Sequence, residues 1–150
     1  MSETRIGSVS VRAELHDTDL ESVTGLHDVV SRYQHLENEF KEHCYAVYLN
    51  GANETLAEKL IGLGNAQQAT VDIADIVRTA ILVNARAVIL VHNHPSGQVE
   101  PTPNDTKLTE AIRDGLDLFD IHLLDHVIIG RDTHHSMRKT RDVQFTGGEA

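Results

Sequence analysis

The stretch that most constrains the fold is a short apolar run that leads into two histidines and then into the start of a helix. Residues 86–91 (RAVILV) are apolar and partly β-branched, which predicts a buried strand. The Pro-Ser-Gly sequence at 95–97 interrupts this strand. Thr102 follows as a predicted helix N-cap, with Pro103 at the first helical position and Asp105 at the third. The chain therefore turns back on itself directly after the strand.

This turn brings metal-ligating side chains together. His92 and His94 are spaced i and i+2, so on a strand they share one face, and the returning helix start carries Asp105 toward them. Catalytic zinc sites commonly take three ligands from His and carboxylate and leave a fourth position for water. Each residue also has a plainer interpretation, with Asp105 as a helix cap and the histidines as hydrogen-bonded core residues. Their occurrence together favours a zinc site formed by His92, His94 and Asp105.

Three segments carry a family resemblance: HNHPSG at 92–97, PTPND at 101–105 and LLDHVIIG at 123–130. They resemble the RadC branch of the JAB/JAMM (MPN+) metalloproteases, whose pattern is H-x-H-x7-S-x2-D with a Glu on an earlier strand. His92, His94 and Asp105 match this pattern, and Thr102 holds the position of the family serine. The resemblance spans about residues 40–140. It implies a three-layer α/β/α fold with a mixed central sheet, similar in architecture to cytidine deaminases, and a Zn²⁺ cofactor.

The resemblance also implies a general base. Glu42 begins a segment (EHCYAVYLN) that is similar to the family's E-x-F-x-V-x-x-L-D. A zinc hydrolase needs a carboxylate beside the water rather than on the metal, because a group must accept the water's proton. Glu42 could equally be a solvated acid before a strand, and Glu37 and Glu39 lie close enough in sequence to compete for the role.

The implied reaction is hydrolysis of an amide bond by metal-activated water, as in a JAMM-type peptidase or isopeptidase. Glu42 takes the proton, and a hydroxyl stabilises the oxyanion, either Thr102 by family position or Ser96 by proximity. The expected partner is a protein or peptide substrate, with ubiquitin-like conjugates among the candidates. The alternative is a non-catalytic interaction module of the JAB fold that is associated with DNA repair or recombination. The sequence leaves the natural substrate and the oligomeric state open.

Composition limits the other classes. The 150 residues are 40% hydrophobic, which suits one domain with a core, and no apolar run is long enough to span a membrane. The formal net charge of −10 disfavours direct nucleic-acid binding. It is also compatible with a salt-adapted cytoplasm. The single cysteine, Cys44, excludes the zinc-deaminase pattern and is expected to be a packing residue. Together with the absence of a visible secretory signal, it predicts a cytoplasmic protein.

The rest of the chain is expected to form a flexible arm over 1–18 and a single domain over 19–145. Asp125 and His126 interrupt the last apolar strand, and two interpretations are open for them. In one, they contact the metal ligands without binding the metal themselves. In the other, plainer interpretation, they point away from the core. Spacing and turn signals predict helices over 26–36 (with Thr24 as N-cap), 71–84 and 103–118, and strands over 44–50, 55–61, 86–91 and 123–129.

Overall fold

The computed structural model describes residues 7–16, 25–64 and 69–147. Residues 7–16 form no helix or strand and are exposed. The division into an arm and one domain stays a prediction. The elements run in the order α1 (Leu26–Tyr33), η1 (Gln34–Asn38), β1 (Glu42–Leu49), β2 (Thr55–Gly64), β3 (Ala69–Val71), α2 (Ile73–Leu82), β4 (Ala87–Asn93), α3 (Pro103–Asp117), β5 (His122–Gly130), β6 (Thr133–Ser136) and α4 (Met137–Thr140).

The strands form one mixed sheet of order β3-β2-β1-β4-β5-β6. β4 and β5 are parallel, and the other neighbouring strands are antiparallel. A parallel pair needs a crossover connection, and α3 supplies it between β4 and β5. The predicted hairpin at Asn50-Gly51 joins β1 to β2, where the Asn50 side chain accepts hydrogen bonds from the backbone of Ala52 and Glu54.

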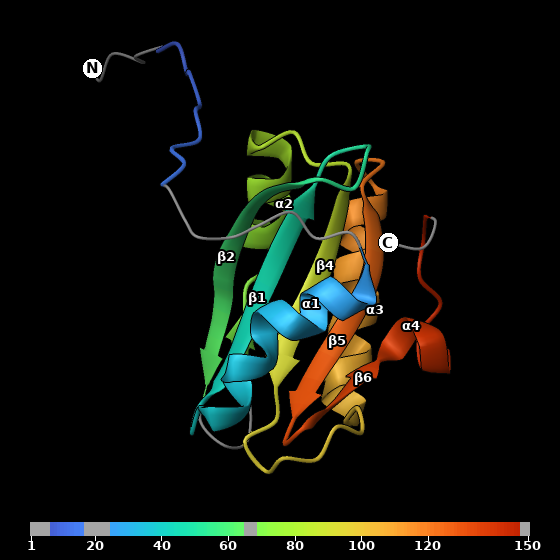
Figure 1. Ribbon diagram of the computed structural model, residues 1–150. Coiled ribbons are helices and arrows are strands. Elements are labelled where there is room, and N and C mark those ends of the chain that lie inside the picture. The colour runs from blue at the N-terminus through green and yellow to red at the C-terminus, as the bar shows by residue number, and fades with distance from the viewer. Residues whose placement is uncertain (1–6, 17–24, 65–68, 148–150) are drawn as a thin grey trace, which may run out of the picture.

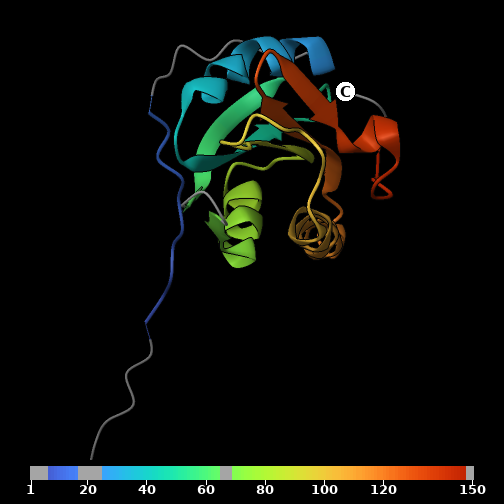
Figure 2. The ribbon, with the colours of Figure 1, turned by 90° about the horizontal axis from the view of Figure 1, so that it is seen from below.

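Helices cover both faces of the sheet, so the predicted three-layer α/β/α fold is confirmed. Figure 2 shows α1 on one side and α2 and α3 on the other. Alternate residues of β4 serve the two layers: Ile89 and Val91 pack under α1 with Val29 and Tyr33. The opposite face of the sheet packs against α2 and α3, with a core of Val88, Leu90, Tyr48, Ile76, Ile112 and Leu116.

The strand-to-helix turn forms as its sequence predicts. The Thr102 hydroxyl accepts a hydrogen bond from the Asp105 backbone N–H (3.1 Å), and Asp105 Oδ2 accepts one from the Thr102 N–H (2.8 Å). This reciprocal pair is a capping box, and Pro103 follows the cap at the first helical position. The cap fixes where α3 begins, and therefore where Asp105 lies relative to the end of β4.

Other details depart from the sequence-based expectations. Gly25 holds the N-cap position of α1, and Thr24, which was predicted to cap it, lies outside the described residues. β3, β6 and α4 were not predicted, and all three have four residues or fewer. No helix in the described part of the chain is long and apolar enough to cross a membrane.

Candidate metal centre

Four side chains from two strands, the loop after β4 and one helix meet at the end of β4. Glu42, His92, His94 and Asp105 each offer a ligand atom, and these atoms all lie within 4.8 Å of one another. β1 begins where β4 ends because the two strands are antiparallel, with Cys44 opposite His92. Figure 1 shows this end of β4 at the bottom of the view, where the loop toward α3 leaves the sheet. The structure thus brings the three predicted ligands and the predicted base together.

His92 and His94 present their Nε2 atoms to the cluster, 2.9 Å apart. Asp105 reaches both imidazoles, with Oδ1 3.3 Å from His92 Nε2 and Oδ2 3.0 Å from His94 Nε2. Glu42 Oε1 lies 3.5 Å from His92 Nε2. His94 Nδ1 lies 3.0 Å from the backbone oxygen of Gln98, and this contact leaves Nε2 as the metal-facing nitrogen when Nδ1 carries the proton.

The spacing and chemistry of these atoms fit a zinc ion. Tetrahedral coordination at about 2.0–2.1 Å to nitrogen separates two ligand atoms by roughly 3.3 Å. The separations among His92, His94 and Asp105 are 2.9, 3.0 and 3.3 Å. Two imidazoles and a carboxylate are also a common donor set for catalytic zinc. These three residues could therefore hold the metal, with Glu42 beside it.

Charge is concentrated in this cluster. Burial raises the pKa of Asp105, but hydrogen bonds with His92 and His94 and the charge of His92 outweigh this effect, so the net pKa lies well below its ordinary value. Burial lowers the pKa of His94, yet the hydrogen bond and charge of Asp105 outweigh it and raise the net pKa. The carboxylate stays ionised, and the metal-free site attracts a positive charge, whether a proton or a metal ion.

Asn93, between the two histidines, holds Glu42 in place. Its Oδ1 accepts a hydrogen bond from the His43 backbone N–H (2.7 Å), and its Nδ2 donates to the Lys41 carbonyl (3.1 Å). The amide is 1% exposed and grips the backbone on both sides of Glu42. Sequence reasoning missed this residue. The signal that could have found it is a polar residue at a strand position whose neighbours are all buried.

The competing acids lie elsewhere. The Glu37 side chain accepts hydrogen bonds from Gln34 and from the Asp132 backbone N–H, and Glu39 is exposed. Among the described residues, neither joins the metal-ligating cluster, whereas Glu42 does. Glu42 is therefore the acid that the fold brings to the two histidines.

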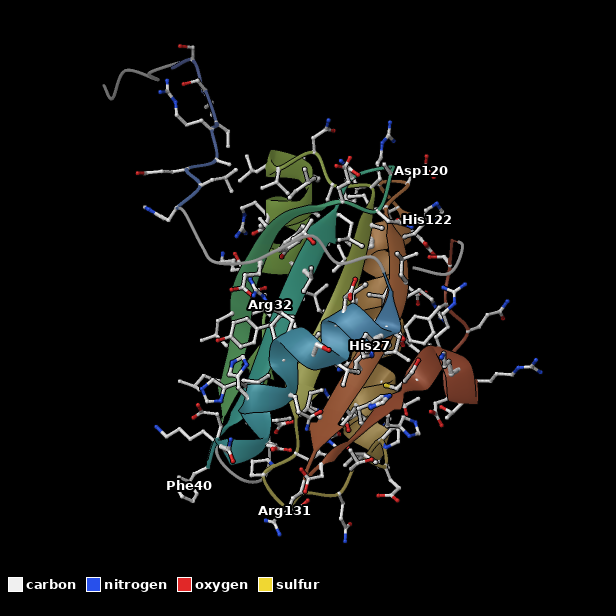
Figure 3. All side chains as sticks on the ribbon, viewed as in Figure 1. His27, Arg32, Phe40, Asp120, His122 and Arg131 are labelled. Atoms are coloured by element: carbon white, nitrogen blue, oxygen red, sulfur yellow. The ribbon has the colours of Figure 1, made fainter. Side chains whose placement is uncertain are left out.

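The two predicted hydroxyl donors, Thr102 and Ser96, are exposed residues near the ligands in sequence. Thr102 is exposed, and its oxygen caps α3 with a lone pair, which leaves the hydroxyl proton for another acceptor. Ser96 is exposed in the loop after β4, where its oxygen accepts a hydrogen bond from the Gln98 N–H (3.3 Å). Figure 3 shows Phe40 and Arg131 at this same end of the molecule, and Phe40 is 93% exposed.

The plainer interpretation of Asp125 and His126 is wrong. Both are buried, because β5 lies inside the sheet, between β4 and β6, and helices cover both faces of the sheet. Asp125 accepts hydrogen bonds from the Ser136 hydroxyl (2.6 Å) and the Arg138 backbone. His126 lies on the other face, with Nε2 2.5 Å from His92 Nδ1. Burial, followed by the charge of His92, lowers the pKa of His126 well below its ordinary value.

Cys44 packs in the core, as its sequence context predicts. It is 3% exposed, and burial together with the charges of Glu42 and Asp105 raises the pKa of its thiol. A thiol that keeps its proton is a poor nucleophile. The chemistry of this site therefore belongs to the four clustered residues.

Comparison with known proteins finds a matching family model and several similar sequences. A family model described as "RadC-like JAB domain" matches residues 22–142. Similar proteins include a UPF0758 protein of Chlorobaculum parvum, 37% identical over 77% of this chain and 53% of its own length. Another is a UPF0758 protein of Streptococcus suis, 36% identical over 69% of this chain and 42% of its own length. A third, a UPF0758 protein of Streptococcus gordonii, is 36% identical over 73% of this chain and 49% of its own length. The chain spans about half the length of these relatives.

Proposed function

The chain belongs to the family of RadC-like JAB domains, and from this premise we propose that it is a zinc-dependent hydrolase of amide bonds. The observation that carries the proposal is the convergence of Glu42, His92, His94 and Asp105 within 4.8 Å of one another. In this proposal His92, His94 and Asp105 hold Zn²⁺. A bound zinc ion supplies Lewis acidity, which lowers the pKa of a coordinated water to about 7.

Glu42 acts as the general base. Its Oε1 lies 3.5 Å from His92 Nε2, beside the ligands, and Asn93 fixes the backbone on both sides of it. From this position the carboxylate takes a proton from the attacking water and returns it to the leaving amine. Either Thr102 or Ser96 donates a hydrogen bond to the oxygen that gains negative charge. Loss of one such donor typically costs about 3–4 kcal/mol in the transition state.

The substrate in this proposal is a protein or a peptide, cleaved at a peptide or isopeptide bond, and the protein works in the cytoplasm. The exposed Phe40, two residues before Glu42, supports a polypeptide substrate because it offers an apolar contact at the rim of the site. A non-catalytic interaction module is the second candidate. The complete set of ligands plus a base favours the enzyme, since a binding module has no need of a carboxylate beside the metal.

Metal analysis and a hydrolysis screen test the proposal. We expect the purified protein to bind zinc at His92, His94 and Asp105, and to cleave members of a panel of peptide and isopeptide substrates. Glu42→Gln should keep the zinc and lose turnover, because the amide holds the same space but accepts no proton at neutral pH. Glu39→Gln is the matched control, since that exposed acid lies outside the cluster. Turnover that survives in the Glu42 variant would assign the base to another group.

A further inference from the structure

A chain of buried polar groups runs behind His92, away from the proposed metal. His92 Nδ1 lies 2.5 Å from His126 Nε2, and His126 Nδ1 lies 2.6 Å from the Thr109 hydroxyl. The Thr109 hydroxyl also contacts the backbone oxygen of Asp105 at 2.6 Å. His92, His126 and Thr109 are 2, 1 and 0% exposed, so water cannot substitute for any of these contacts.

The proton on the Thr109 hydroxyl fixes which atom donates and which accepts in each of these hydrogen bonds. A hydroxyl carries one hydrogen, and here it is donated to the Asp105 carbonyl, so the Thr109 oxygen must accept from His126 Nδ1–H. A neutral imidazole has one N–H, which leaves His126 Nε2 as an acceptor. His92 then donates from Nδ1, which leaves its Nε2, on the side of Glu42 and Asp105, as the nitrogen that would bind the metal.

We propose that His126 and Thr109 are positioning residues for the metal centre. They hold His92 in the tautomer that binds a divalent cation through Nε2. They also connect two proposed ligands on different elements, since this row of hydrogen bonds starts at His92 on β4 and ends on the backbone of Asp105 in α3. This inference rests on the proposed function, because it assigns His126 and Thr109 to the same zinc site.

A packing role alone does not account for these residues. On the same buried face of α3, one and two turns further along, Ile112 and Leu116 fill the core with apolar side chains. Thr109 and His126 occupy equally buried positions with polar groups, which cost free energy unless each is hydrogen-bonded. Metal-ligating histidines almost always donate their second ring N–H to a fixed acceptor, and His126 is that acceptor for His92.

The first test measures zinc affinity by competition with a chromogenic chelator. Thr109→Val keeps the size of the side chain but removes the acceptor for His126 Nδ1–H. The proton then moves to His126 Nε2 and faces His92, which favours the wrong tautomer of His92. We expect the zinc dissociation constant to rise about 10–100-fold. Thr109→Ser, which keeps the hydroxyl, is the matched control and should stay close to the wild-type affinity. An unchanged affinity in a folded Thr109→Val protein would overturn the proposal.

The second test needs no variant. Nitrogen-15 NMR of the imidazole rings in the zinc-loaded wild-type protein reports which nitrogen carries each proton. We expect Nδ1–H on both His92 and His126. A proton on His126 Nε2 would contradict the inference even if Thr109→Val did not fold. Neither test measures hydrolysis, so a protein with these tautomers that cleaves no amide would refute only the proposed function. A protein that binds no zinc would refute both.

Discussion

Asp105 caps α3, and we propose that it also binds the metal; two substitutions should separate these two roles. Its Oδ2 accepts the Thr102 N–H at 2.8 Å, which completes the capping box of α3. The same carboxylate lies 3.3 Å from His92 Nε2 and 3.0 Å from His94 Nε2, where we place the metal. Asp105→Asn keeps an oxygen for the cap but removes the negative charge. Asp105→Ala removes the charge and also the cap's acceptor.

The expected magnitudes follow from these contacts. Loss of a capping hydrogen bond costs about 1 kcal/mol. The free energy of unfolding of metal-free Asp105→Ala should therefore be about 1 kcal/mol lower than that of metal-free Asp105→Asn. Zinc at 100 times its dissociation constant stabilises a folded protein by about 2.7 kcal/mol. Both variants lose one of three proposed ligands, so this zinc-dependent stabilisation should disappear from both of them.

Urea unfolding of the wild-type protein and the two variants, with zinc and with a chelator, measures both quantities. Thr102→Ala is the control, because it breaks the other half of the capping box and leaves the Asp105 carboxylate in place. It should lose stability and keep its response to zinc. If zinc stabilised Asp105→Asn as much as the wild type, Asp105 would be a helix cap and not a ligand. Equal stability of metal-free Asp105→Asn and Asp105→Ala would refute the capping argument.

Two further predictions concern the dependence of stability on pH and the hydrogen bonds from Asn93 to the backbone around Glu42. Asp105 raises the net pKa of His94 in the fold, so the metal-free protein should lose stability as the pH rises from about 6.5 through the raised pKa, measured as a falling urea midpoint. A midpoint that rises with pH in this window would contradict the sign. Asn93→Ala removes both hydrogen bonds to the backbone around Glu42, so kcat should fall by a much larger factor than the zinc content does. If kcat and zinc content fell by the same factor, Asn93 would act on metal binding instead.

The local part of the site was predictable because its signals are local. An apolar run, a Pro-Ser-Gly break and a capping box lie within twenty residues, and each specifies the backbone of its own neighbours. The strand and helix bounds at β4 and α3 accordingly agree with prediction to within a few residues. Short elements such as β3 and β6 offer too few residues for a periodic pattern, and their pairing with long strands decides their structure.

The position of Glu42 could not be derived from spacing. Fifty residues separate it from His92, and they meet because β1 and β4 pair in the register that sets Cys44 opposite His92. No pattern within either strand encodes that register; burial of the apolar faces of both strands selects it. The family resemblance therefore carried information that the residues alone lacked, and it identified Glu42 ahead of Glu37 and Glu39.

The role of His126 depends on a still finer feature of the sheet. β5 pairs with β4 in parallel, and the register shifts by one residue between Val88 and Ile89, where Leu124 is the extra residue. Beyond this irregularity, His126 is opposite Leu90 on the face that carries His92, and Asp125 is on the other face. Without the extra residue, Asp125 would take the place opposite Leu90 and put a carboxylate behind His92. The apolar pattern of β5 is compatible with both registers, so only the paired sheet reveals that an imidazole, and not an acid, lies against His92.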